Sequence, residues 1–260
     1  MAFMRKTPDD QGSNPCVPIF IKMIFKIFLF NMGYGLGLDG SVKNYATRWY
    51  RYLHCPRNTR ENILKETKKL ITANKPDVCC LIEIEGSHAD FFNKDLPYYD
   101  ITNKYGSKSV LSKLPVFNNK SNAVFSNKKY KIKRRFLKNG TKKLLYEVSL
   151  PKDITLFTTH FSLSKNIRKK QFIELKNLIK NKKKVIVCGD FNIFGGFKEL
   201  DPLLSGTDLN IVGKKDTFPA CNPKKAFDLF LCSKNIPVKN CKVINKRLSD
   251  HLPVLLELKI

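Results

Sequence analysis

Short apolar runs recur along the chain, and most of them end abruptly in polar residues. Runs of four to eight apolar residues are typical of strands that are buried on both faces of a sheet. On this basis we predict buried strands at residues 23–30, 78–82, 154–159, 184–189, 226–232 and 253–258.

Two longer segments show helical periodicity instead. Residues 58–73 carry apolar side chains at helical spacing behind Asn58 or Thr59, either of which can act as the N-cap. Residues 166–180 carry a second apolar stripe, with lysines on the opposite face. The apolar residues of the two stripes are Ile63, Leu64, Leu70 and Ile71, and Phe172, Leu175, Leu178 and Ile179. Both segments are predicted to be amphipathic helices.

The middle of the chain predicts antiparallel strands. Residues 130–136 alternate between apolar and polar positions and are followed, across Asn139-Gly140, by the strand-like residues 142–148. An Asn-Gly pair between two such runs favours a β-hairpin with a two-residue turn. Hairpins and helix-linked crossovers in one chain predict an α/β fold in which helices cover mixed sheets.

The 260 residues are long enough for one large domain, and neither a linker nor a repeat divides them. We assign the domain to residues 23–260 and treat residues 1–22 as a leader, with Met23 as a candidate start. The apolar stretch 17–30 is interrupted by Lys22 and Lys26. It falls short of the roughly 20 apolar residues of a membrane-spanning helix, so we predict no transmembrane segment.

The charge of the chain favours polyanionic partners. The formal net charge is +26, and 39 of the 48 basic residues are lysines. A protein this basic is attracted to nucleic acid or to an anionic surface. An AT-rich genome also enriches Lys, Asn and Ile, so the charge alone leaves both explanations open.

The eight cysteines lack the spacing of a metal site, since Cys79 and Cys80 are adjacent and no C-x-x-C occurs. Several of them lie inside apolar runs, which is typical of free thiols in a reducing compartment. We therefore expect a cytoplasmic protein.

Polar side chains that can bind ligands follow nearly every predicted strand. Asp190 and Asn192 follow the run at 184–189, and side chains two apart on an extended strand point the same way. Gly-Asp-x-Asn is also an ordinary turn sequence, so this strand end alone leaves a plain turn open. The polar residues at the other strand ends are Asn31, Glu83, Thr159-His160, Asp228 and Ser249-Asp250-His251.

These residue types suit phosphoester hydrolysis. Carboxylate and amide oxygens bind a hard divalent cation such as Mg²⁺, which takes further ligands from water and substrate phosphate. Histidines can donate to phosphate oxygens, and an aspartate can take a proton from an attacking water. Structural roles stay open for single residues, because a buried histidine is often a core residue and Asp228 can stabilise the fold.

Taken in order, the motifs around these residues resemble those of the endonuclease/exonuclease/phosphatase superfamily. They are FNMGYG, PDVCCLIEIE, TTHFSL, CGDFNIF, AFDLFLCS and LSDHLPV. The resemblance covers about residues 23–260. It implies the fold of DNase I, a four-layer α/β sandwich in which two mixed β-sheets pack face to face and are flanked by helices.

The resemblance also implies a metal site. Asn31 and Glu83 would hold Mg²⁺, with Mn²⁺ as a substitute, and Asp250 would lie close to it. Glu85 follows Glu83 on the same face of the predicted strand, so either glutamate can be the ligand; the alignment of the motif favours Glu83. The family often has Gln where this chain has Ile82.

The remaining motif residues are implied to act on the phosphate. Asp190 would be the general base or would orient the water, and Asn192 would bind phosphate. His160 and His251 would stabilise the phosphate charge, with Asp228 orienting His251.

Such a resemblance fixes a reaction class and leaves the substrate open. Residues 101–146 contain thirteen basic residues, no acidic one and several aromatic ones. They form either a surface that tracks nucleic-acid phosphates or a solvated outer hairpin. We favour a monomeric phosphodiesterase acting on nucleic acid. The alternative is a phosphatase or phosphodiesterase of small-molecule or lipid head-group phosphates, which the compact chain favours because it leaves little room for large DNA-binding insertions. The family often has Arg where this chain has Ala226, which weakens any transfer of substrate specificity. The intact motifs disfavour an inactive binding module.

Overall fold

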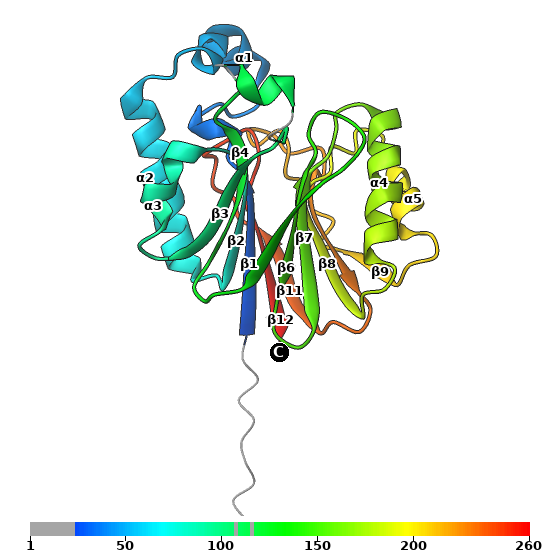
Figure 1. Cartoon of the computed structure of the whole chain (residues 1–260). Helices are drawn as coiled ribbons and strands as arrows, with labels where there is room; N and C mark the ends of the chain where they lie inside the picture. The colour runs from blue at the N-terminus through cyan, green and yellow to red at the C-terminus, as the bar shows by residue number, and fades with distance from the viewer. Residues whose placement is uncertain (1–23, 107–108, 115–116) are drawn as a thin grey trace, which may run out of the picture.

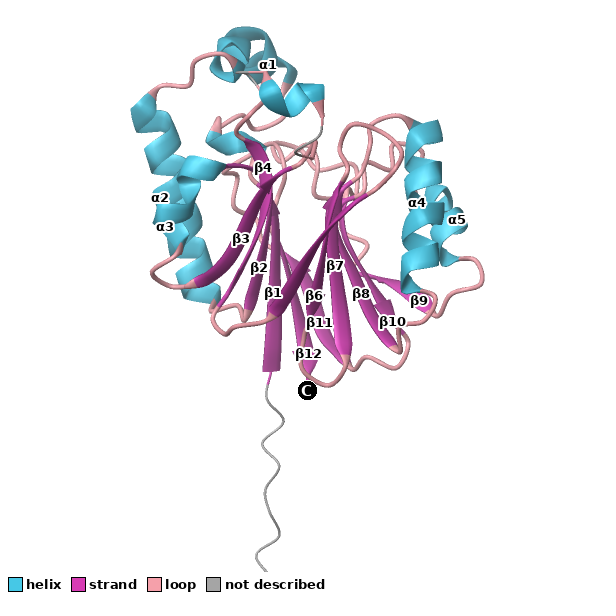
Figure 2. Cartoon of the chain, in the orientation of Figure 1, coloured by secondary structure: helices cyan, strands magenta, loops and turns pink. Residues whose placement is uncertain are grey.

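The computed structural model describes residues 24–106, 109–114 and 117–260. Two mixed six-stranded sheets form its centre, and helices lie on their outer faces (Figures 1 and 2). The predicted leader, residues 1–22, lies outside the described residues.

The first sheet has the strand order β11-β12-β1-β2-β4-β3. Its strand β1 is parallel to β2 on one side and antiparallel to β12 on the other, so segments from opposite ends of the chain pair. The strands are β1 (Ile24–Asn31), β2 (Val78–Glu85), β3 (Tyr98–Asn103), β4 (Lys120–Ser126), β11 (Val238–Val243) and β12 (Val254–Lys259).

The second sheet has the strand order β5-β6-β7-β8-β10-β9. β7 and β8 are parallel, and β10 runs antiparallel to β8. The strands are β5 (Lys131–Phe136), β6 (Leu144–Ser149), β7 (Ile154–His160), β8 (Lys184–Asp190), β9 (Leu209–Val212) and β10 (Asp228–Ser233).

Three apolar cores join the sheets to each other and to the helices. Ile27, Val148 and Leu256 belong to the core between the sheets, whereas the outer faces pack against helices α2 and α3 or α4 and α5 (Figure 2). The four-layer α/β fold is thereby confirmed. The helices are α1 (Val42–Arg48), α2 (Arg57–Asn74), α3 (Ala89–Phe92), α4 (Lys165–Ile179) and α5 (Asp201–Leu204).

The predicted buried strands are confirmed, with small shifts at their ends, as β1, β2, β7, β8, β10 and β12. Both predicted helices are also present, as α2 and α4. The predicted cap of α2 is wrong, because the N-cap residue is Pro56 and its side chain accepts no capping hydrogen bond.

The predicted two-residue turn at Asn139-Gly140 is wrong as well, because residues 137–143 join β5 to β6. Side chains of α4 hold this longer loop. Glu174 accepts a hydrogen bond from the backbone amide of Asn139 at 3.0 Å, and Gln171 donates to the carbonyl oxygen of Asn139 at 3.0 Å. Tertiary contacts here override the local turn signal.

The cysteines follow the prediction, since the seven in the described residues are free thiols. Within the same residues, no helix is both long and apolar enough to cross a membrane.

Candidate active site

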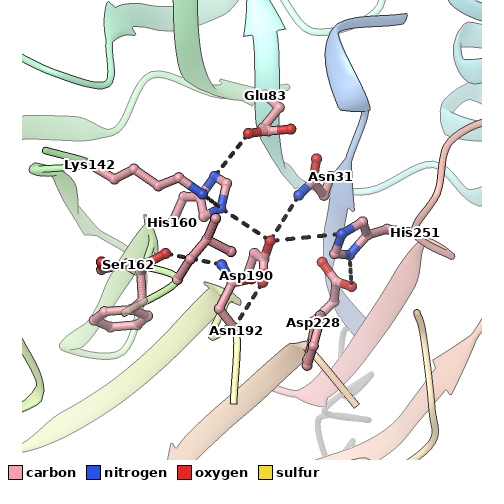
Figure 3. Close-up of polar contacts among 12 residues, drawn as sticks. Asn31, Glu83, Lys142, His160, Ser162, Asp190, Asn192, Asp228 and His251 are labelled. Carbon is pink, nitrogen blue, oxygen red and sulfur yellow. Dashed lines mark hydrogen bonds and ion pairs between the residues drawn. The ribbon is translucent and has the colours of Figure 1, made fainter. Parts of the chain in front are cut away.

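Polar side chains from both sheets lie together where several strands begin or end. Asn31 ends β1 beside β2, and His160 ends β7 in register with Asp190, the last residue of β8. Asp228 begins β10 and pairs with Asp190 from the other side. Because the sheets pack face to face, these strand ends converge in one polar cluster (Figure 3).

Asp190 lies at the centre of this cluster and is 2% exposed. Its Oδ2 accepts a hydrogen bond from Nδ2 of Asn31 at 3.0 Å. The same oxygen lies 3.2 Å from Nε2 of His160 and 3.9 Å from Nε2 of His251. Burial raises the pKa of Asp190 to about 6, which suits a group that exchanges protons near neutral pH.

Asp190 and Asn192 form a turn and also belong to the cluster. The backbone amide of Asn192 donates to Oδ1 of Asp190 at 3.1 Å, and Asn192 has a φ of +51°. Its side chain donates to the carbonyl oxygen of Phe161 at 3.0 Å. A turn therefore brings the two residues together, and not the strand pleat that we predicted, because β8 ends at Asp190.

An irregularity in β2 turns Glu83 toward the cluster. The register with β4 shifts between Leu81 and Ile84, and Glu83 has a φ of +54°. Its backbone amide donates to Oδ1 of Asn122 at 3.1 Å, and its Oε1 lies 3.5 Å from Nδ1 of His160. Positive φ at a residue other than glycine is uncommon and tends to occur at functional sites.

Glu85, the alternative ligand, lies elsewhere. Its carboxylate is 3.0 Å from Nζ of Lys120 and 3.1 Å from Nη1 of Arg60, and it also faces the buried His88. The irregularity in β2 separates two glutamates that a regular pleat would put on the same face. Glu83 is the one that joins the strand-end residues.

Two residues that the sequence analysis missed bind Glu83. Lys104, which is 2% exposed, donates to Oε1 of Glu83 at 2.8 Å. The hydroxyl of Tyr34, in the short 3-10 helix Gly33–Gly35, donates to the same oxygen at 3.1 Å. Burial alone would raise the pKa of Glu83, but the ammonium of Lys104 holds it well below its usual range.

Lys142 is a third residue that was missed. It lies on the loop 137–143, and its Nζ contacts Nε2 of His160 (Figure 3). Burial lowers the pKa of Lys142 to about 8, and burial together with Lys142 lowers the pKa of His160 well below its usual value. The only sequence signal for Lys104 and Lys142 was their place in the basic segment 101–146.

His251 and Asp228 form a buried pair. Nδ1 of His251 lies 2.7 Å from Oδ2 of Asp228, and the Thr217 hydroxyl donates to the same oxygen at 2.7 Å. Burial alone would lower the pKa of His251, but the carboxylates of Asp228 and Asp190 raise it to about 10. The imidazolium is therefore the stable form at neutral pH.

Asp250 is next to His251 in the chain and is only partly buried, unlike Asp190. The Tyr45 hydroxyl donates to its Oδ2 at 2.7 Å, and the Ser249 hydroxyl donates to its Oδ1 at 2.8 Å. Tyr45 belongs to α1, so this carboxylate connects the site to the segment that follows β1.

The basic segment 101–146 does not act as one surface. Lys104 and Lys142 line the site. Arg134 forms an ion pair with Asp100 on β3 of the other sheet, and Arg135 forms one with Glu147 on the neighbouring strand β6. Phe125 is fully buried in the core under α2 and α3. The interpretation of the whole segment as stacked rings along a phosphate track is therefore wrong at Phe125.

Fold and site together define an α/β sandwich that carries a buried cluster of carboxylates, amides and histidines at its strand ends. The model of the Endonuclease/Exonuclease/phosphatase family matches residues 58–251, and the chain belongs to this family. No curated protein matches the chain by sequence.

Solved structures share the fold at low sequence identity. An endonuclease/exonuclease/phosphatase family protein from Bacteroides thetaiotaomicron is 14% identical, with a TM-score of 0.64 over 91% of this chain and 97% of that one. A mannosyl-6-phosphatase from the same organism is 15% identical, with a TM-score of 0.62 over 91% and 100%. TDP2 of D. rerio, solved with a single-strand DNA product, is 16% identical, with a TM-score of 0.64 over 91% and 99%.

Proposed function

We propose that the chain is a divalent-metal-dependent phosphodiesterase that hydrolyses nucleic acid by attack of water on phosphorus. The proposal rests on one observation, the convergence of five side chains at the same end of the strands of the two sheets. They are Asn31, Glu83, His160, Asp190 and His251. This set joins a proton acceptor to hydrogen-bond donors and to hard oxygen ligands, which are the groups that the reaction requires.

The oxygen donors fit Mg²⁺. Glu83 and Asn31 supply a carboxylate and an amide beside Asp190, and Asp250 is next to His251 in the chain. Within the described residues, no group of three or more Asp, Glu, His or Cys side chains forms a metal cage. Mg²⁺ usually binds one or two carboxylates and completes its shell with water and substrate phosphate, so Glu83 and Asn31 would hold it together with these ligands.

A bound Mg²⁺ would supply positive charge to the phosphate oxygens. Asp190 would take the proton of the attacking water, since its raised pKa of about 6 still leaves it ionised at neutral pH. The imidazolium of His251, held by Asp228, would donate to a non-bridging oxygen. His160 and Asn192 would bind further phosphate oxygens, because donors fixed in a buried site stabilise charge that develops in the transition state.

Nucleic acid is the substrate that the charge of the chain supports best. The net charge of +26 favours a polyanion, and the structurally similar TDP2 was solved with single-strand DNA. One observation favours the alternative, a phosphatase of small phosphomonoesters. Lys104 and Lys142 both reach the cluster, and such added positive charge suits the greater charge of a phosphomonoester.

The test compares metal-loaded and EDTA-treated wild type on plasmid, RNA, sugar phosphates, inositol phosphates and phospholipids. We expect hydrolysis of nucleic acid only with Mg²⁺ or Mn²⁺, and weaker metal binding in Glu83→Gln. Asp190→Asn should lower kcat by at least the roughly 100-fold that general-base catalysis contributes, without a fall in Tm. Asp201→Asn, at an exposed carboxylate on α5, is the matched control.

Equal rates with and without metal would contradict the metal-dependent mechanism. Near-wild-type turnover of Asp190→Asn would remove Asp190 from the reaction. Hydrolysis of sugar phosphates alone would replace nucleic acid by the phosphatase alternative.

A further inference from the structure

Residues 42–54, which we call the aromatic-basic segment, expose large apolar side chains next to the candidate active site. The segment contains α1 and a 3-10 helix, Trp49–Tyr52, and none of the residues in these two helices is buried. Its exposed fractions are 85% for Val42, 60% for Trp49, 43% for Tyr50, 46% for Tyr52 and 72% for Leu53. Such a concentration of exposed apolar side chains marks an interaction surface.

The segment is anchored beside the candidate active site. Tyr45 bonds Asp250 at 2.7 Å, and Nη1 of Arg51 donates to the carbonyl oxygen of Leu36 at 2.9 Å. Beneath it, Cys55 and Leu36 belong to a small apolar core of their own. The exposed rings are therefore held on a fixed base, and α1 lies at the end of the molecule toward which β1 runs (Figure 1).

The charge of the segment selects an anionic occupant. The segment has three basic residues, Lys43, Arg48 and Arg51, and no acidic one. Lys43 and Arg48 are both exposed on α1. A partner that matches this surface carries regularly spaced negative charge and flat apolar groups, which is the chemistry of unpaired bases on a phosphate backbone.

We propose that the aromatic-basic segment is a binding platform for single-stranded nucleic acid. Bases stack on Trp49, Tyr50 and Tyr52, phosphates bind Lys43 and Arg48, and the strand continues past Asp250 into the active site. The substrate role of this platform rests on the proposed function, whereas its binding can be measured without catalysis.

Trp49 is the only tryptophan in the chain, so its fluorescence reports on this surface alone. The experiment titrates the full chain in EDTA with a twelve-nucleotide oligothymidylate and, as a comparison, with an abasic strand of the same length. We expect the oligothymidylate to quench Trp49 and to bind more tightly than the abasic strand, because only the former can stack.

Anisotropy with a labelled oligothymidylate then measures the variants. Trp49→Ala should raise Kd at least about 5-fold, the lower end of what one stacked base contributes, and Trp49→Phe should recover part of the affinity. Tyr98→Ala is the matched control, since Tyr98 is 44% exposed at the start of β3, at the opposite end of the strands. Lys43→Gln with Arg48→Gln should make the negative slope of log K against log salt less steep by about 1.4. Lys183→Gln with Lys239→Gln, at two exposed lysines outside the segment, should leave the slope unchanged.

Unchanged binding in Trp49→Ala, or binding to anionic phospholipid vesicles but not to oligothymidylate, would overturn the platform. The proposed function is tested separately on wild type with bis(p-nitrophenyl) phosphate and Mg²⁺. Hydrolysis of this small diester without oligonucleotide binding would refute the platform and leave the phosphodiesterase standing. Trp49-dependent binding without any hydrolysis would support the platform and refute the phosphodiesterase.

Discussion

Three residues at the site, Tyr34, Glu83 and Asn192, have positive φ although none is a glycine. Such conformations cost on the order of 1–3 kcal/mol each and persist only where the surrounding contacts fix them. Glu83 is fixed by the side chain of Asn122, and Asn192 by the carboxylate of Asp190. At these three residues the strained backbone directs side chains toward the candidate active site.

The Asp228–His251 pair should make stability depend on pH. The pKa of His251 is about 10 in the folded chain, above the roughly 6.5 of an unfolded histidine. The pair therefore stabilises the fold fully below pH 6.5 and loses this contribution as the pH rises to about 10. In Asp228→Asn the stabilisation by protonated His251 should be smaller. The free energy of unfolding, measured with urea, should therefore change less between pH 6.5 and 10 than in the wild type.

The difference in the free energy of unfolding between the wild type and Asp228→Asn reports on the pair, because the two chains share all other titrating groups. If the difference between the two chains is constant from pH 6.5 to 10, the assignment of the raised pKa to His251 is incorrect. Asp201→Asn, at an exposed carboxylate on α5, serves as a carboxylate control.

The strand-end residues could be predicted because a polar side chain directly after a buried run is conspicuous. Lys104 and Lys142 could not, since they lie on loops whose paths depend on tertiary contacts such as those between α4 and the loop 137–143. Lysines are also too frequent in this chain for any one of them to stand out. The choice between Glu83 and Glu85 depended on an irregularity in β2 that alternation does not reveal.

At the scale of elements, the close approach of β7 and β8 sets the geometry of the site. Gly189 has a φ of +146°, and a Cβ at this position would lie 1.8 Å from the carbonyl oxygen of Thr159. The next residues along the two strands are His160 and Asp190, which pair in register. The absence of a side chain at Gly189 therefore allows these two groups to meet.

Gly189→Ala should push β8 away from β7. We expect a loss of stability on the order of 3 kcal/mol, because the clash is with backbone and cannot be relieved by a rotamer change. The Tm should fall, and kcat measured at low temperature should fall as well. Gly86→Ala is the control, since its nearest neighbour would be 3.7 Å away; equal effects of the two substitutions would contradict the argument.

Most of the elements that the sequence did not predict are edge strands and short helices. β3, β9 and β11 lie at or near the sheet edges, and β11 has the exposed, lysine-containing sequence VKNCKV. An edge strand needs only backbone pairing and can remain polar, so it lacks the apolar signal by which central strands were found. β4 is buried, but it begins with the polar residues KSN and therefore lacks the long apolar run that marks the other buried strands.

At the scale of the whole molecule, the domain should fold without residues 1–22. β1 begins at Ile24 and the site residues lie beyond it, so a chain starting at Met23 should keep its Tm and its activity. A chain starting at Leu29 should fail to fold, because it lacks most of β1. A large fall in Tm of the shorter deletion would assign residues 1–22 to the domain.

The pairing of β1 with β12 has a consequence for biosynthesis. β12, the antiparallel neighbour of β1, begins about 220 residues after β1 ends, and synthesis of that stretch takes on the order of ten seconds or more at typical translation rates. During that interval an apolar strand edge stays open to other nascent chains. Since Asp250 and His251 lie shortly before β12, a ribosome stalled before this point would hold a nascent chain that lacks two residues of the candidate active site.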